Sequence, residues 1–145
     1  MSEISPDAQR VRSTIPGKRA TIFLIEDEVV ILDLLKSVLE LEGYDVLVAS
    51  NGEKALDLYI PYQNKIDLIV SDLELPGMKG DEMYLEMKKI TPKIKFIFAS
   101  GYIDDYMRTY LQALGVKDFV DKPYHPFQIL QTIRVLLGEE IENVK

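Results

Sequence analysis

Asp72 occupies the position in this sequence where a side chain could most readily do chemistry. It follows a short apolar run at 68–70, and a turn that contains proline and glycine begins at Pro76. Apolar runs of this length that are bounded by glycine and proline are typical of fully buried parallel strands. We therefore expect Asp72 to lie where a buried strand leaves its sheet.

Three further runs are each followed by residues that could contribute to a site. Glu26, Asp27 and Glu28 follow the run at 21–25, Ser100 and Gly101 follow the run at 94–99, and Lys122 and Pro123 come one residue after the run at 118–120. Right-handed crossovers place the carboxyl ends of all strands of a parallel sheet at one edge, where open α/β sheets bind ligands. We therefore predict that carboxylates, a hydroxyl and an ammonium converge with Asp72 on one crevice.

Carboxylates that converge in this way need a cation. Glu26, Asp27 and Asp72 would repel one another and drive one pKa upward unless a positive charge lay between them. A small set of oxygen ligands suits Mg²⁺ or Mn²⁺ better than zinc. A bound divalent ion also attracts a phosphoryl group, which Asp72 could then attack to form an aspartyl phosphate. Lys122 would balance the remaining charge, and the Ser100 hydroxyl could donate to a phosphoryl oxygen.

Each of these residues also has an ordinary structural explanation. The acidic residues at 26–28 could cap a helix and interact with its dipole. Asp72 precedes a Pro-Gly turn, where aspartate is common, and Ser100 and Lys122 could each lie in a solvated turn. The chemical interpretation rests on all of these positions falling at strand ends on the same edge.

The segments between the apolar runs have helical spacing, so strand and helix alternate five times. The predicted strands are 21–25, 44–49, 67–71, 94–99 and 118–120. The predicted helices are 28–41, 52–59, 81–90, 104–114 and 126–137. This alternation predicts an α/β fold with a doubly wound, five-stranded parallel sheet and helices on both faces.

Length and composition predict one domain. The chain has 145 residues and no cysteine, which excludes disulfides, thiolate metal sites and a cysteine nucleophile. Its net charge of −7 disfavours direct binding to nucleic acid or to a membrane surface. We find no secretory signal and no apolar run long enough to span a bilayer, so we expect a cytoplasmic protein. We assign 20–138 to the domain, 1–19 to a flexible tail or linker and 139–145 to a C-terminal tail.

Four motifs in this sequence resemble those of the response-regulator receiver domains of two-component signalling. They are I-E-D-E at 25–28, S-D-L-E-L-P-G-M-K-G at 71–80, F-A-S-G at 98–101 and D-K-P at 121–123. The resemblance covers about residues 20–137. It implies a flavodoxin-like strand order of 2-1-3-4-5, with Asp72 as the phosphoacceptor and a cis bond between Lys122 and Pro123.

The same resemblance implies a cofactor and a partner. Mg²⁺ (or Mn²⁺) would be held by Asp27 directly, by Glu26 through water, by Asp72, and by the backbone carbonyl of Glu74. The chain would be a signalling domain that promotes its own phosphorylation and dephosphorylation, not an enzyme with a separate substrate. A histidine kinase or a histidine phosphotransfer protein would supply the phosphoryl group from a phospho-histidine.

The resemblance also assigns a switch to Ser100 and Phe119. The hydroxyl would move toward the phosphoryl group while the aromatic ring turns inward. Because Phe119 lacks the hydroxyl of the commoner tyrosine, this switch would work by packing alone. Glu74 and Tyr102 occupy positions that tune the lifetime of the phosphoryl group in the family, and we expect a bulky Tyr102 to shield it.

A row of tyrosines continues from Tyr102 with a spacing of four residues. Tyr106 and Tyr110 could simply cover the flank of the helix 104–114, or they could form a partner surface, since tyrosine is enriched at interfaces. In the family, the face formed by this helix, strand 118–120 and helix 126–137 mediates output or a homodimer. We expect His125 to be a solvated loop residue.

Three other functions fit parts of this pattern. A flavodoxin-type FMN protein needs a hydroxyl- and glycine-rich phosphate loop after the first strand, where this chain has E-D-E at 26–28. A Mg²⁺-dependent aspartyl-phosphate phosphatase resembling the haloacid dehalogenases would carry D-x-D at the first strand, whereas D-L-E stands at 72–74 here. A docking module that is not phosphorylated would usually lack the acids or the lysine, all of which are present.

Overall fold

The computed structural model describes residues 19–139, in which five strands and five helices alternate. The strands are β1 (Thr21–Ile25), β2 (Asp45–Ala49), β3 (Leu68–Asp72), β4 (Phe96–Ser100) and β5 (Asp118–Asp121). The helices are α2 (Val29–Leu41), α3 (Gly52–Tyr62), α4 (Gly80–Ile90), α5 (Asp105–Leu114) and α6 (Pro126–Leu137). The alternation predicted from the sequence is therefore confirmed.

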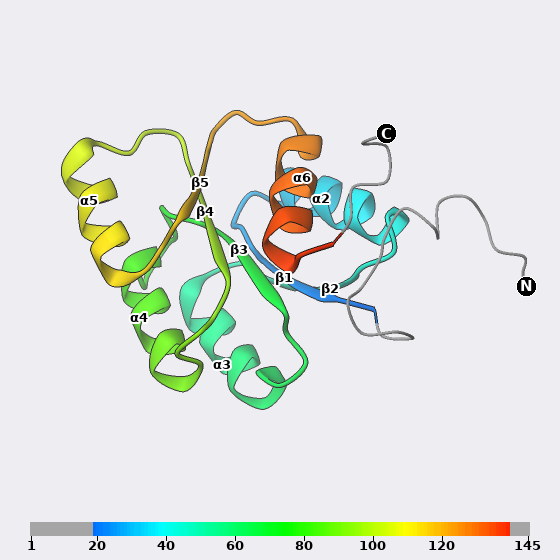
Figure 1. Ribbon diagram of the computed structural model, residues 1–145, viewed down its shortest axis with the longest axis horizontal. Helices are drawn as coiled ribbons and strands as arrows, with labels where there is room; N and C mark the ends of the chain where they lie inside the picture. Colours follow the sequence, from blue (N-terminus) through cyan, green and yellow to red (C-terminus); the bar gives the residue numbers. More distant parts are fainter. Residues whose placement is uncertain (1–18, 140–145) are drawn as a thin grey trace, which may run out of the picture.

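All five strands are parallel and form one sheet in the order β2-β1-β3-β4-β5. Helices α2 and α6 lie on one face of this sheet, and α3, α4 and α5 lie on the other (Figure 1). The predicted doubly wound, flavodoxin-like α/β fold is confirmed. Within residues 19–139, no helix has both the length and the apolar character needed to cross a bilayer.

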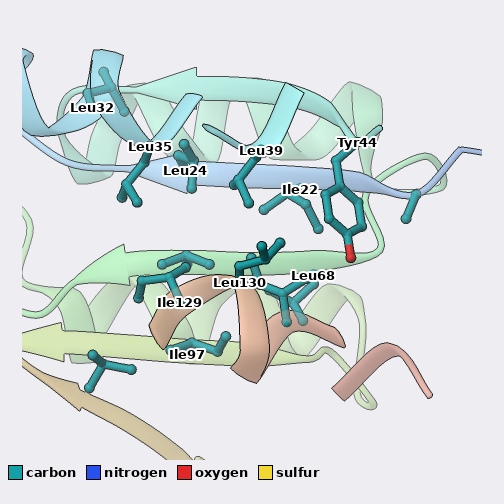
Figure 2. Close-up of a cluster of buried hydrophobic side chains, with 14 residues drawn as sticks. Ile22, Leu24, Leu32, Leu35, Leu39, Tyr44, Leu68, Ile97, Ile129 and Leu130 are labelled. Atoms are coloured by element: carbon teal, nitrogen blue, oxygen red, sulfur yellow. The ribbon is translucent and has the colours of Figure 1, made fainter. Parts of the chain in front are cut away.

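The central strands β3 and β4 are buried along their whole length, because helices cover both of their faces. Figure 2 shows the cluster beneath α2 and α6, where Leu35 and Leu39 of α2 meet Ile129 and Leu130 of α6 against the sheet. Complete burial of one such side chain contributes about 1.5–3 kcal/mol to folding. This cluster holds β1 and β3 in place from one side.

The cluster on the opposite face contains a group of packed aromatic rings. Tyr84 of α4 meets Phe96 edge-on with ring centroids 5.1 Å apart, and the Phe98 ring lies 4.7 Å from that of Phe96. Such pairs add about 0.5–1.5 kcal/mol beyond simple burial. Because Phe96 and Phe98 belong to β4, these contacts fix the strand that ends at Ser100.

Helix α3 is longer than the predicted helix 52–59, because it continues through Pro61 to Tyr62. Pro61 cannot donate a helical hydrogen bond, so one bond of the last turn is missing. Near the end of the helix this loss is tolerated. The side chain of Gln63 donates from Nε2 to the Ile60 carbonyl at 3.1 Å, which satisfies one of the terminal carbonyls.

Strands β3 and β4 also lie slightly later in the chain than predicted. Each ends one residue later than the predicted range, on Asp72 for β3 and on Ser100 for β4. At the other end of β4, Ile94 is not in the strand, because its amide donates to the Thr91 carbonyl at 3.1 Å in a turn. Apolar character alone therefore extended the predicted strand too far toward the N-terminus.

His125 is exposed, as expected, and it also caps α6. Its Nδ1 accepts a hydrogen bond from the Phe127 amide at 3.2 Å, and its own amide donates to Gln128 Oε1 at 2.7 Å. The imidazole stacks on the Phe127 ring with centroids 5.2 Å apart. Pro126 occupies the first turn, where its missing amide hydrogen is not needed.

Arg19 and Glu139, at the two ends of the described segment, both form hydrogen bonds with Tyr44. The Tyr44 hydroxyl donates to Glu139 Oε1 at 2.7 Å, and the Tyr44 carbonyl accepts from Arg19 Nη2 at 3.4 Å. Glu139, which we assigned to the C-terminal tail, is only 8% exposed. Both residues thus contact the folded body, whereas the rest of the predicted tails, 1–18 and 140–145, lies outside the described residues.

A buried carboxylate at this position affects stability. Burial raises the pKa of the Glu139 carboxyl, while its hydrogen bond with Tyr44 and the charge of Arg134 act in the opposite direction. A carboxyl whose pKa is higher in the folded state binds its proton more tightly there than in the unfolded chain. The contribution of Glu139 to stability is therefore greatest at acid pH and declines as the pH rises through the raised pKa.

We predict that Glu139→Gln, which keeps an acceptor for Tyr44, changes the unfolding free energy in a pH-dependent manner. The difference between variant and wild type should move in favour of the variant as the pH rises from about 4 to about 7, because only the wild type acquires a buried charge. Urea unfolding at several pH values measures this difference. Glu53→Gln, at an exposed position, is the control. A Glu139→Gln difference that is independent of pH would contradict the prediction.

Candidate functional site

The residues predicted to form the crevice all lie at or just beyond the carboxyl ends of strands. Asp72 and Ser100 are the last residues of β3 and β4. Glu26 and Asp27 follow β1, and Lys122 follows β5. The strand registers place these ends side by side, and the connections from β4 to α5 and from β5 to α6 leave the sheet along this edge (Figure 1).

Glu26, Asp27 and Asp72 form a tight group of carboxylates. One oxygen of each lies within 4.8 Å of the others. Glu26 and Asp72 are only 4% and 6% exposed, whereas Asp27 is exposed to solvent. Carboxylates this close repel one another, and burial removes the water that would otherwise stabilise two of them. The ligand set is all oxygen and strongly negative, so it fits a hard divalent cation such as Mg²⁺.

Lys122 supplies positive charge to this group. Its Nζ lies 3.1 Å from Asp72 Oδ2 and 3.3 Å from Glu26 Oε1, and its side chain is 18% exposed. Burial alone would lower the pKa of Lys122, but the hydrogen bonds and charges of Asp72 and Glu26 outweigh it and raise the pKa. The ammonium therefore keeps its proton and offsets part of the repulsion between the carboxylates.

The Glu26 carboxyl has a raised pKa, mainly because it is buried. The amide of Glu28, which donates to Glu26 Oε2 at 3.2 Å, lowers the pKa, as does Lys122. The charge of Asp72 raises it further. Keeping the buried Glu26 carboxyl ionised therefore costs free energy, and a bound cation would reduce that cost.

Ser100 forms a small hydrogen-bond network with Glu74 and Tyr102. The Ser100 hydroxyl has two acceptors for its single hydrogen, Glu74 Oε2 at 3.1 Å and the Tyr102 carbonyl at 2.8 Å. It also accepts from the Tyr102 amide at 3.2 Å. The Glu74 amide donates to Asp72 Oδ1 at 3.2 Å. The sequence placed Glu74 and Tyr102 near the site but did not indicate that they share the Ser100 hydroxyl.

Local backbone geometry fixes the segments that follow β3 and β5. The bond between Lys122 and Pro123 is cis, as predicted, and the Lys122 amide donates to the Ser100 carbonyl at 2.8 Å. The Gly80 amide, at the start of α4, donates to the Leu73 carbonyl at 3.2 Å. A Cβ at Gly80 would lie 2.7 Å from that carbonyl oxygen. Glycine therefore allows α4 to begin this close to the end of β3.

A cleft of about 570 Å³ opens beside Lys122, between α2 and the connection from β5 to α6. Leu34, Leu35 and Tyr124 form part of its lining. Our sequence analysis did not single out Tyr124, whose only signal is its position next to Lys122-Pro123. Burial and then the charge of Glu26 raise the pKa of Tyr124 to about 12, so its hydroxyl stays protonated at neutral pH.

The predicted switch and partner residues lie on and around α5. Phe119 of β5 is half-buried, and the Arg108 guanidinium lies 4.6 Å from its ring centroid. Tyr102 and Tyr106 are 77% and 80% exposed, and Tyr110 is 36% exposed. The tyrosine row is therefore open to solvent, and the Tyr102 side chain makes little contact with the site in this conformation.

The profile of the response regulator receiver domain family matches residues 22–134, which is most of the chain. The chain belongs to this family. Receiver domains are signalling modules of two-component systems that bind Mg²⁺ at an acidic pocket, and the acidic group formed by Glu26, Asp27 and Asp72 fits such a pocket.

Two curated relatives contain similar receiver sequences within longer proteins. The sensor kinase CckA of Brucella abortus (strain 2308) is 34% identical over 121 residues, which cover 83% of this chain and 13% of CckA. The response regulator SaeR of Staphylococcus aureus (strain USA300) is 31% identical over 116 residues, which cover 80% of this chain and 50% of SaeR. The chain therefore spans half or less of these relatives.

Solved structures of receiver domains have the same fold. A receiver domain protein from Clostridium thermocellum has a TM-score of 0.77 at 29% identity, over 82% of this chain and 94% of that chain. The non-phosphorylated HemR receiver domain from Leptospira biflexa has a TM-score of 0.77 at 29% identity, over 84% and 97%. These neighbours agree with the family assignment and with the observed strand order.

We predict that Lys122→Met lowers the free energy of unfolding by about 2 kcal/mol at neutral pH in EDTA, because two buried carboxylates lose their cation. Urea unfolding measures the loss. Lys65→Met, at an exposed position, is the control and should change stability by less than about 0.5 kcal/mol. Adding Asp72→Asn to Lys122→Met should recover part of the loss, because one carboxylate is neutralised. No recovery in the double variant would argue against charge compensation.

Proposed function

We propose that this receiver domain accepts a phosphoryl group on Asp72 from the phospho-histidine of a histidine kinase or a histidine phosphotransfer protein, in the cytoplasm. The observation that carries the proposal is the ion cluster at the carboxyl edge of the sheet. In it, the buried Asp72 contacts Lys122 at 3.1 Å and lies within the carboxylate group completed by Glu26 and Asp27. This cluster combines a nucleophile, a cation site and a fixed positive charge.

The proposed chemistry assigns a role to each side chain. Asp27 and Asp72 would bind Mg²⁺ (or Mn²⁺) directly, Glu26 through water, and Glu74 through its backbone carbonyl. The bound cation would neutralise the carboxylates and attract the phosphoryl oxygens. A carboxylate oxygen of Asp72 then attacks phosphorus in line: the new P–O bond forms as the P–N bond breaks, and the imidazole keeps the electron pair and takes up a proton. Lys122 offsets the charge of the transferred group.

Ser100 and Phe119 form the proposed switch. After phosphorylation, the Ser100 hydroxyl donates to a phosphoryl oxygen, and Phe119 moves inward by packing alone. The Arg108 guanidinium, 4.6 Å from the Phe119 ring, moves with it. The change thereby reaches the surface that includes Tyr106 and Tyr110. This surface, made of α5, β5 and α6, is proposed to bind the output partner or a second copy of the chain.

The cleft beside Lys122 is suited to the approach of the phosphoryl donor. Leu34, which lines the cleft from α2, is 51% exposed, and Val30 on the same helix is 80% exposed. Phe127, near the start of α6, is 59% exposed. Val30 lies one helical turn from Leu34, and Phe127 follows Pro126, which also lines the cleft. Exposed apolar side chains close to a site indicate an interaction surface. The proposed donor packs an apolar surface of its own on these residues while its phospho-histidine reaches Asp72.

Glu74 and Tyr102 are proposed to tune the lifetime of the phosphoryl group. Both line a hollow beside the loop that follows β3, and the side chains of both are exposed. A water molecule that hydrolyses the acyl phosphate would pass these side chains. In the unphosphorylated conformation Tyr102 is too exposed to shield Asp72, so shielding requires its side chain to move.

Two other functions remain distinguishable by experiment. A Mg²⁺-dependent aspartyl-phosphate phosphatase would turn over a small acyl phosphate continuously. A docking module of the same fold would stay unmodified. The acidic pair, Asp72 and Lys122 lie in one cluster, which favours phosphorylation over docking alone, and the family assignment favours a receiver over a phosphatase.

We predict that incubation with Mg²⁺ and acetyl phosphate adds one base-labile phosphoryl group to the wild type and none to Asp72→Asn, because only the carboxylate can act as the nucleophile. Intact mass spectrometry measures the mass change. Asp118→Asn, at the opposite end of the sheet, is the control and should be modified like the wild type. Phosphate release without any accumulated phosphoprotein would support the phosphatase, and an unmodified wild type that releases no phosphate would support the docking module.

We predict that Asp27→Asn weakens Mg²⁺ binding by at least roughly tenfold, because one direct carboxylate ligand is neutralised. Isothermal titration calorimetry measures the affinity. As the pH is lowered, the Mg²⁺ affinity of the wild type should begin to fall at a pH above the usual pKa of a glutamate. The reason is that the pKa of Glu26 is raised, so protons compete with the cation at that higher pH. Asp33→Asn, at an exposed position on α2, serves as the control. Equal affinities of Asp27→Asn and the control would contradict the assignment.

A further inference from the structure

The side chain of Glu74 contacts the hydroxyl that is proposed to act as the switch. Glu74 Oε2 lies 3.1 Å from Ser100 Oγ, although the two residues are 26 positions apart in the sequence. The Glu74 amide is fixed at the same time, since it donates to Asp72 Oδ1 at 3.2 Å. One residue therefore contacts both the proposed phosphoacceptor and the proposed switch.

The Ser100 hydroxyl has one hydrogen to donate, and its surroundings leave few directions for it. Its lone pairs already accept from the Tyr102 amide at 3.2 Å. The hydrogen can go to the Glu74 carboxylate or to the Tyr102 carbonyl. Among the described residues, no hydrogen bond joins this hydroxyl to Asp72. The donor that a phosphoryl group would need is thus in use elsewhere.

The negative charge of Glu74 strengthens its hydrogen bond with Ser100. A hydrogen bond to an ionised acceptor is about twice as strong as one between neutral groups. The exposed Glu74 carboxylate therefore gives Ser100 a negatively charged acceptor, as a phosphoryl group on Asp72 would. A phosphoryl group on Asp72 would carry more negative charge, and it would also repel the Glu74 side chain.

We propose that the Glu74 carboxylate is a latch that holds the Ser100 hydroxyl in the unphosphorylated position and is displaced when Asp72 is phosphorylated. The inference rests on the proposed function. It adds that the side chain of Glu74, as distinct from its backbone, stabilises the inactive conformation. Glu74 is thus a positioning residue that acts through Ser100.

The first test measures the variants in EDTA, and it takes the wild type bound to Mg²⁺ and the phosphoryl analogue beryllofluoride as its reference. The amide resonances of Ser100 and Tyr102 should shift in Glu74→Ala, because the latch is absent, and the shift should point toward their positions in that reference state. Glu74→Gln keeps a neutral acceptor and should give a smaller shift. Glu53→Ala, an exposed glutamate on α3, is the control and should leave both resonances in place. Unchanged resonances in Glu74→Ala would overturn the latch.

The second test measures the affinity for beryllofluoride with Mg²⁺, by titration followed by NMR. Loss of one competing hydrogen bond should make Glu74→Ala bind roughly three- to tenfold more tightly than wild type. The gain should shrink when Ser100→Ala is also present, because the latch then has nothing to hold. The affinity gain could instead be equal in Glu74→Gln and Glu74→Ala, and unaffected by Ser100→Ala. That result would mean that Glu74 acts only by repelling the negatively charged ligand, and it would overturn the proposal.

The two tests also separate the latch from the function on which it rests. A wild type that binds no beryllofluoride and accepts no phosphoryl group would contradict the proposed function. A wild type that binds it normally, with Glu74→Ala at the same affinity, would contradict the latch alone.

Discussion

Repulsion between carboxylates at the carboxyl edge of the sheet is the constraint on which the rest of this molecule depends. Glu26 and Asp72 are almost fully buried, and Asp27 lies close to both. Lys122 contacts two of these groups but carries a single positive charge, so the site stays negative. That excess charge favours a divalent cation. In the proposed function, a bound cation would let an incoming phosphoryl group meet positive charge where the carboxylates alone would repel it.

Repulsion of this kind tends to push the strand ends apart, and the two apolar clusters resist it. Strands β3 and β4 are buried on both faces, between α2 and α6 on one side and α3, α4 and α5 on the other. Each fully buried large side chain contributes about 1.5–3 kcal/mol, so a few of them offset the cost of one buried charge. The close approach of Gly80 to the Leu73 carbonyl adds a local constraint directly beyond Asp72. The site is therefore held by packing that its own residues do not provide.

Much of the fold could be predicted from the sequence, because its signals are local. Apolar runs and helical spacing are periodic over a few residues, and parallel topology then places all strand ends on one edge. Contacts between distant side chains have no such signal. The bond between Tyr44 and Glu139 spans 95 positions, and nothing in the sequence near either residue indicates it.

Glu74 shows within the site that contacts between distant side chains cannot be predicted from the sequence. Its backbone and its side chain make separate contacts. The family resemblance placed its carbonyl among the cation ligands, a role that any residue at this position could fill. Its side chain points to Ser100 instead, and the hydrogen bond depends on the particular way in which the loop after β3 meets the end of β4. In the proposed site, the cation would restrict only the backbone at this position and would leave the side chain variable. Such a position can alter the balance between two conformations without altering the chemistry at Asp72.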